Sequence, residues 1–94
     1  MGHTNPVRGE QLEVTESDDG LVVFDPATEF VHHLNPTAAV IFDLCDGSRD
    51  VEAIASILAA AFDLDQLPTQ DTLAGLTDLA ERKLIRWEAH GTAS

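Results

Sequence analysis

Hydrophobic and polar residues alternate along two short segments near the start of the chain. LEVTE at 12–16 shows this alternation, and LVVFD at 21–25 is rich in β-branched residues. Both patterns are typical of β-strands. SDDG between them favours a tight turn, because Gly20 tolerates a positive φ and aspartate side chains bond to their own backbone. These residues predict a first β-hairpin.

A third strand is expected at 29–34, where the sequence reads EFVHHL. The DPAT turn before it contains a proline, whose fixed φ suits the second position of a β-turn. Side chains alternate along a strand. Phe30, His32 and Leu34 are therefore expected on one face, and the two residues between them on the other. The result is a three-stranded meander.

Three helices are predicted in the remainder of the chain. Asn35 followed by proline is a typical helix start, and the first helix is expected over 36–45, before an Asp-Gly pair. Asp50 is a good N-cap for a second helix over 51–62, where apolar residues recur at helical spacing. DLDQLP then breaks the pattern, and a third helix is expected over 69–84.

The order of these elements predicts the fold class and the domain organisation. We expect flexible tails at 1–11 and 89–94 and a single domain at 12–88. The fold class is α+β and winged helix-turn-helix-like, with a three-stranded antiparallel β-meander followed by three α-helices. No apolar run is long enough to cross a bilayer, and the first residues lack a secretory segment. A cytoplasmic location without membrane contact is therefore expected.

Acidic residues dominate the charged positions. The 94-residue chain has 5 Lys and Arg against 17 Asp and Glu, a formal net charge of −12. Such a chain repels nucleic acid, because most nucleic-acid binders gain affinity from cations that displace counterions. A winged-helix DNA-binding regulator or adaptor, with the third helix as recognition helix, is the alternative that shares the expected fold. The acidic balance disfavours it.

Residues that would catalyse a reaction or hold a metal are not brought together by this sequence. Cys45 is the only cysteine, so a zinc site or iron–sulfur cluster of several thiolates is excluded. Its apolar neighbours favour a packing role. His32 and His33 are adjacent on the expected strand and point to opposite faces, and the acidic pairs lack the calcium-loop pattern. We therefore expect no catalytic residue, cofactor or metal, and a binding protein rather than an enzyme.

Gly75 lies inside the third predicted helix. Glycine there costs about 1 kcal/mol relative to alanine. Two interpretations are open: tolerance or close packing against another helix, or room for the backbone of a ligand to approach.

Several segments, taken in order, resemble one family. HHLNPTAAVIFDLCDG at 32–47, VEAIA at 51–55 and LTDLAERKLI at 76–85 resemble the PqqD-like proteins, also called RiPP recognition elements, which serve ribosomally made and modified peptides. The resemblance covers about 12–85, and LNPTAA at 34–39 is its most specific part. It implies a winged helix-turn-helix domain that does not bind DNA. Such a domain holds the leader segment of a precursor peptide as an added strand and delivers it to a modifying enzyme.

Carried onto this chain, the resemblance implies a peptide-pairing strand at 29–33 and a matching helix at 72–83. Strand addition is physically suited to this role. An unpaired strand edge offers backbone N–H and C=O groups to a peptide, and side-chain pockets beside it give selectivity. The two helix leucines in the expected site are equally compatible with the core, and its two cations with capping of the helix end. As site residues, the cations would meet acidic leader residues. The expected peptide-binding residues are Glu29, Phe30, Val31, His32, His33, Leu76, Leu79, Arg82 and Lys83.

Two of these positions depart from the family pattern. His32 stands where an aromatic residue is frequent, and Lys83 where glycine is common. The leader sequence that this chain reads is therefore expected to differ from those of its relatives. The implied partners are a precursor leader peptide and a modifying enzyme, such as a radical SAM maturase or a leader peptidase. We expect a monomer or a dimer formed through edge strands.

Overall fold

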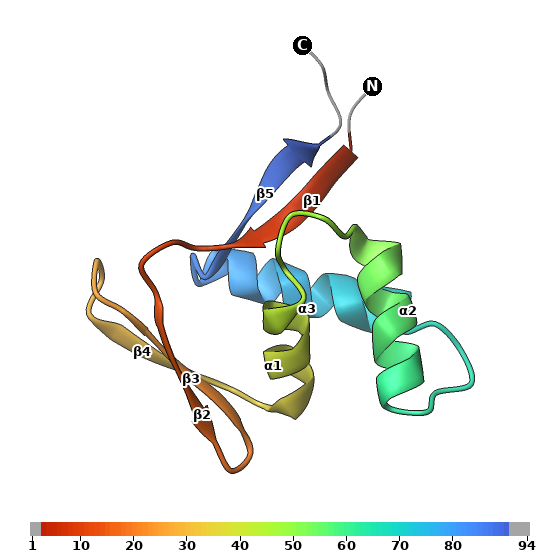
Figure 1. Ribbon diagram of the computed structural model, residues 1–94, viewed down its shortest axis with the longest axis horizontal. Helices are drawn as coiled ribbons and strands as arrows, with labels where there is room; N and C mark the ends of the chain where they lie inside the picture. The colour runs from red at the N-terminus through yellow and green to blue at the C-terminus, as the bar shows by residue number, and fades with distance from the viewer. Residues whose placement is uncertain (1–2, 91–94) are drawn as a thin grey trace.

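The structure, a computed structural model, describes residues 3–90. The three helices pack together on one side, a three-stranded sheet lies on the other, and a two-stranded ribbon projects beside the chain ends (Figure 1). The elements are β1 (His3–Arg8), β2 (Glu13–Ser17), β3 (Gly20–Asp25), β4 (Phe30–Leu34), α1 (Pro36–Asp43), α2 (Val51–Ala61), α3 (Thr69–Glu81) and β5 (Ile85–His90). The predicted α+β class, with a three-stranded antiparallel meander followed by three helices, is confirmed.

Two hairpins build the larger sheet, as the sequence predicts. The strand order is β2-β3-β4, and both pairings are antiparallel. Gly20 follows a two-residue turn and has a φ of 144°. A Cβ atom at this position would lie 1.8 Å from the carbonyl oxygen of Leu34, a separation that only glycine permits. This close contact holds the start of β3 against the end of β4.

The third strand of the meander starts one residue later than predicted. Glu29 has a φ of 63°, and its N–H donates to the carbonyl oxygen of Asp25 at 2.7 Å. A left-handed residue interrupts the pleat of a strand. Glu29 therefore belongs to the turn before β4, and its N–H is already used within the protein.

Side-chain caps start the first two helices where the sequence places them. The Asn35 side chain accepts a hydrogen bond from the N–H of Ala38 at 2.8 Å, and Asp50 accepts one from Ala53 at 2.9 Å. These bonds satisfy N–H groups that have no partner inside a helix. α3 begins after Pro68 without such a cap. Its start therefore depends more on packing.

The prediction of flexible tails is wrong for the two terminal strands. β1 pairs antiparallel with β5, from His3 opposite His90 to Arg8 opposite Ile85. The predicted N-terminal tail thus contributes a strand, and the first two residues of the predicted C-terminal tail, 89–90, belong to β5. The rest of those tails, 1–2 and 91–94, lies outside the described residues.

The loop after α1 holds the other edge of β1. The N–H of Arg8 donates to the Cys45 carbonyl at 2.8 Å, and the N–H of Gly47 donates to the Pro6 carbonyl at 3.0 Å. Pro6 has no backbone N–H and so cannot donate a hydrogen bond to this loop. The side-chain amide of Asn5 donates to the Gly47 carbonyl instead, at 3.0 Å. β1 therefore has partners on both sides, although its sequence lacks strand periodicity.

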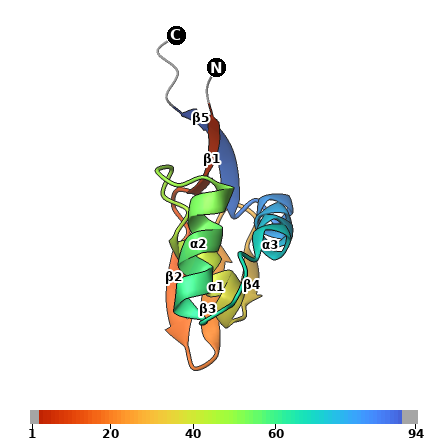
Figure 2. The same ribbon diagram turned by 90° about the vertical axis from the view of Figure 1, so that its right-hand side faces the viewer.

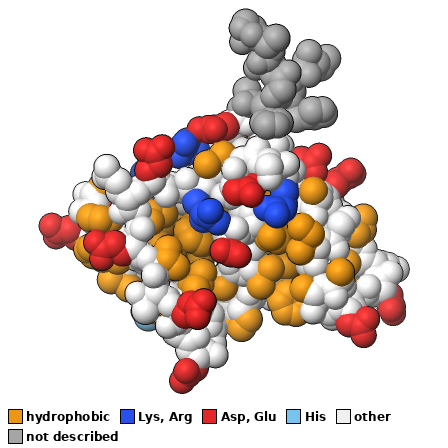
Figure 3. Space-filling view, in the orientation of Figure 1, with side chains coloured by type: hydrophobic (Ala, Val, Ile, Leu, Met, Phe, Trp, Pro, Cys, Tyr) orange, Lys and Arg blue, Asp and Glu red, His pale blue; other side chains and the backbone are white. Residues whose placement is uncertain are grey.

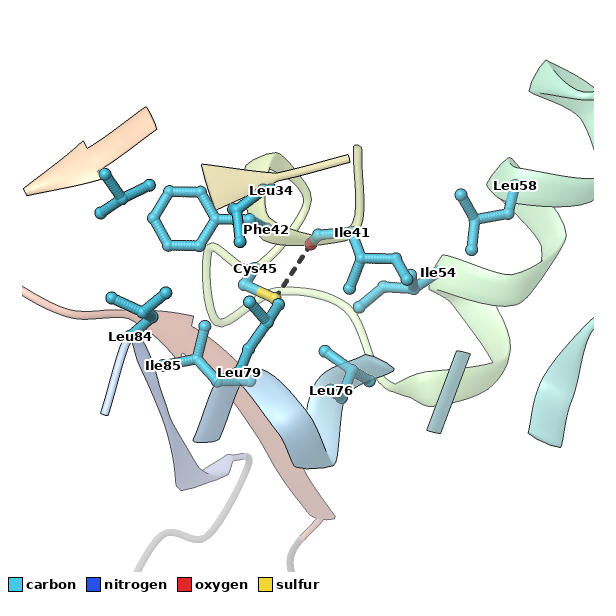
Figure 4. Close-up of a cluster of buried hydrophobic side chains, with 11 residues drawn as sticks. Leu34, Ile41, Phe42, Cys45, Ile54, Leu58, Leu76, Leu79, Leu84 and Ile85 are labelled. Atoms are coloured by element: carbon cyan, nitrogen blue, oxygen red, sulfur yellow. Dashed lines mark hydrogen bonds between the residues drawn. The ribbon is translucent and has the colours of Figure 1, made fainter. Parts of the chain in front are cut away.

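One hydrophobic core joins the helices, the larger sheet and β5 (Figure 4). Cys45 lies inside it, and its thiol donates to the Ile41 carbonyl oxygen at 3.1 Å. Burial raises the pKa of this thiol to about 12, so it remains protonated and unreactive at neutral pH. A Cβ atom on Gly75 would lie 3.0 Å from Cδ1 of Ile41, so this glycine serves the close packing of α3 on α1. The buried cluster comprises Val23, Leu34, Ile41, Phe42, Cys45, Ile54, Leu58, Leu76, Leu79, Leu84 and Ile85.

Candidate functional site

β4 is an unpaired edge of the larger sheet. It pairs with β3 on one side, and no described strand pairs with its other side. Figure 2 places β4 and α3 on one side of α1, and β2 on the opposite side. α1 packs against both β4 and α3. The free edge of β4 therefore lies on the same side of the molecule as the third helix.

The hydrogen-bond alternation decides which backbone groups of β4 are free. The two-residue turn between β2 and β3 is closed by bonds between its flanking residues, Ser17 and Gly20. Successive residues of an antiparallel strand bond to opposite neighbours. The backbone groups of Gly20 therefore point towards β2, and those of Leu21 towards β4, where Leu21 lies opposite Leu34.

Counting along β4 from Leu34 then assigns the remaining residues. The backbone groups of Phe30 and His32 face β3, as those of Leu34 do, whereas the groups of Val31 and His33 face the free edge. The edge therefore presents two N–H and two C=O groups at residues that are not in the turn. This is the row of partners that an added strand requires.

The side chains of β4 surround this edge with apolar and aromatic surface. Phe30 is 65% exposed and Val31 is 54% exposed, and alternation places them on opposite faces of the sheet. The Phe30 ring meets the ring of His32 edge-on, with centroids 6.3 Å apart. The Nε2 atom of His32 is buried without a hydrogen-bond partner among the described residues. His32 thus carries an unsatisfied polar atom beside an exposed aromatic ring.

Leu76 and Leu79 do not line a surface site. Both side chains lie in the core, at 0% and 1% exposure, so they cannot touch a peptide on the surface of the folded domain. The part of α3 that is exposed was missed from the sequence. It carries Leu73, which is 47% exposed, and a shallow depression beside it is lined by Gln70, Leu73, Ala74, Thr77, Asp78 and Glu81. The available signal was helical spacing. Leu73 and Thr77 are four residues apart and so share one face of the helix, which differs from the face of the core leucines.

The two cations of the expected site follow the last turn of α3 and differ in their surroundings. Arg82 forms an ion pair with Asp78, with Nε and Oδ2 3.1 Å apart. Lys83 has a φ of 63°, and its N–H donates to the Ala80 carbonyl at 3.0 Å. Lys83 thus occupies the left-handed position that ends many helices and that glycine prefers. Its side chain is exposed and has no ion pair with an acidic group between residues 3 and 90.

Replacing Lys83 with glycine is expected to stabilise the domain by about 1 kcal/mol, because glycine adopts the left-handed conformation without a Cβ penalty. Urea unfolding followed by circular dichroism measures the change. Lys83→Ala is the matched control, since it removes the same charge and keeps the strain. Equal stability of the two variants would show that the backbone conformation is not the cause.

The site lacks the features of a metal or nucleic-acid site. Within the described part of the chain, no group of three His, Cys, Asp or Glu side chains could hold a metal ion. α3 contains no Lys or Arg between Thr69 and Glu81, so it is poorly suited to enter a DNA groove. No described helix is long and apolar enough to span a membrane. What the geometry offers is a strand edge with adjacent apolar surface.

Comparisons with known proteins agree with this geometry. The model of the family described as "Coenzyme PQQ synthesis protein D (PqqD)" matches residues 20–85. One similar solved structure is "TbiB1 in Complex with the TbiA(beta) Leader Peptide", with a TM-score of 0.70 and 21% identity over 94% of this chain and 99% of that chain. Another is "Lasso peptide synthetase B1 complexed with the leader peptide", with a TM-score of 0.69 and 22% identity over 87% and 98%. At these identities the two structures show a shared fold. Among curated protein sequences, none matches the chain significantly.

Proposed function

The chain belongs to the PqqD family, and from this premise we propose that it binds the leader segment of a ribosomally made precursor peptide as an added strand on β4 and presents it to a modifying enzyme. The observation that carries the proposal is the free β4 edge, with the backbone groups of Val31 and His33 facing outwards. Two similar folds are described in complex with leader peptides, which supports the same use of this one.

The mechanism of binding follows from the edge. Up to four backbone hydrogen bonds form between the leader and the two outward-facing residues, Val31 and His33. These bonds do not depend on the leader sequence. They hold the peptide beside the helices, and the enzyme then meets it at a raised local concentration. No covalent step on this chain is needed.

Selectivity comes from the side chains that flank the edge. Leader side chains alternate between the two faces of the extended sheet. On the helix face they meet the exposed ring of Phe30 and the half-buried ring of His32 that contacts it edge-on. The exposed Lys83 attracts an acidic leader residue, whereas Leu76 and Leu79 are buried in the core and contribute no contact.

An amide NMR titration tests the proposal. The labelled protein is titrated with synthetic leaders of the short precursor peptides encoded next to its gene. We expect the largest shifts at the amides of Val31 and His33, which face the added strand, and smaller ones at Lys83. Shifts confined to β2, or binding of duplex DNA in place of every leader, would overturn it.

The partner enzyme is proposed only by class. A radical SAM maturase and a leader peptidase both require a presented leader, and each fits a chain that has a single, buried thiol and so supplies no cluster of its own. Self-association through the free edges stays a prediction. The net charge of −12 opposes it, so a dimer is expected only at high protein concentration or high salt.

A further inference from the structure

A second concave surface lies between the first turn of α1, the end of α2 and the start of α3. We call it the α2–α3 groove, and it has a volume of about 280 Å³. Its floor is apolar, formed by Ile41 and Leu58 from the core. Its walls carry Phe62, Leu64 and Thr72. The groove is at the N-terminal end of α3, whereas Arg82 and Lys83 follow the C-terminal end, about 20 Å away along a helix of 13 residues.

Thr72 gives this groove an unsatisfied polar group. Its side chain is fully buried, and its hydroxyl oxygen has no hydrogen-bond partner among the residues that the structure describes. Buried hydroxyl groups are almost always bonded in folded proteins. The hydroxyl lies beneath the surface of the groove, so a partner group could bond it only if the lining of the groove moved aside.

The rim of the groove exposes large apolar side chains. Phe62 and Leu64 line it and are 40% and 45% exposed, and Leu67, which is 53% exposed, lies in the same short connection after α2 but outside the lining. Single exposed apolar residues are ordinary in small proteins. Two on the wall of one concave surface, with a third in the same connection, are typical of an interaction site.

The charge around the groove has one sign. Asp71 lines it, and Asp63 and Asp65 lie in the same connection. No Lys or Arg occurs anywhere between residues 50 and 81. Figure 3 shows carboxylates and no cationic side chain at the corner of the molecule formed by this connection. Nucleic acids, anionic membranes and a second copy of this acidic chain are therefore all repelled, and a basic protein surface is attracted.

We propose that the α2–α3 groove docks a protein segment in which an apolar side chain is flanked by Lys or Arg, and that this segment belongs to the modifying enzyme. The inference rests on the proposed function, because the enzyme must hold the chain that presents its substrate. The apolar side chain fills the groove, and the flanking cations meet the aspartates. The groove lies at the opposite end of α3 from Lys83, so a segment docked there leaves the β4 edge free for the leader.

Two-dimensional amide NMR with three short helical peptides tests this proposal. The first peptide presents leucine and tryptophan between lysines. The second has glutamate in place of the lysines, and the third has serine in place of the apolar residues. We expect the first alone to shift the amides of Leu64, Asp71 and Thr72, without moving those of Val31 and His33. Shifts of equal size with all three peptides, or shifts spread over the acidic surface, would overturn it.

Two variants sharpen the result. Asp65→Lys changes an exposed loop residue and is expected to weaken binding of the first peptide at least fivefold. Phe62→Ser removes a wall of the groove and is expected to weaken binding by the same factor. Glu16→Lys on β2 is the charge control and should leave the affinity unchanged within twofold. Equal losses of affinity for Glu16→Lys and for the two groove variants would show adventitious charge attraction and overturn the proposal. A leader titration in the same sample separates the two proposals, because β4 shifts test the leader site alone.

Discussion

Replacing Val31 with proline is expected to lower the affinity for the leader peptide at least about tenfold while the domain stays folded. The proline removes an N–H that faces the free edge, and its ring occupies the space of the incoming strand. The lost bond and the steric conflict together correspond to at least about 1.4 kcal/mol, which is tenfold in affinity. The β3–β4 ladder keeps its bonds, because those come from Phe30, His32 and Leu34.

Two control variants separate the loss of the Val31 N–H from the loss of its side chain and from the effect of a proline at another sheet edge. Val31→Ala removes the same side chain and keeps the N–H, so it should lose less affinity than the proline variant. Glu16→Pro removes an outward N–H on the opposite edge, at β2, and should bind the leader as well as the parent chain. Isothermal titration calorimetry measures all three. Full affinity in a folded Val31→Pro variant would exclude strand addition on β4.

Replacing Gly20 with alanine is expected to destabilise the domain by at least about 3 kcal/mol. The added Cβ would lie 1.8 Å from the Leu34 carbonyl oxygen and 2.9 Å from its carbonyl carbon, and both are backbone atoms that cannot rotate away. The φ of 144° adds strain for any residue with a side chain. The clash is relieved only if β3 and β4 separate at the point where β4 leads into α1.

Gly9→Ala is the matched control for this prediction. Its Cβ would lie 3.2 Å from the flexible end of the Leu12 side chain, so a loss below about 1 kcal/mol is expected. Urea denaturation gives both free energies of unfolding. If the Gly20 variant loses no more free energy of unfolding than the Gly9 variant, β3 does not approach the Leu34 carbonyl as closely as the structure shows.

The local elements could be predicted because their signals are local. The SDDG turn, the Asn35 and Asp50 caps and the apolar spacing of α2 each act over a few residues, and the structure confirms all of them. The alternation along β4 also follows from the strand itself. These features require no knowledge of distant partners.

The β1–β5 ribbon could not be predicted for the opposite reason. Its strands lie at the two ends of the sequence, and His3–Arg8 contains a proline and no alternation of apolar residues. The strand forms because Ile85–His90 and the loop at Cys45 and Gly47 supply bonding partners on its two sides. A pattern within one segment carries no information on such distant partners.

The sequence by itself determined the order of the elements from β2 to α3, the caps of α1 and α2, the turn before β3 and the family of the chain. Only the tertiary structure decided which side chains of α3 are buried, so that Leu76 and Leu79 join the core and Leu73 stays exposed. It also formed the α2–α3 groove from three helices. Periodicity defines the faces of a helix or strand, but the neighbours that cover each face are set by packing over the whole chain.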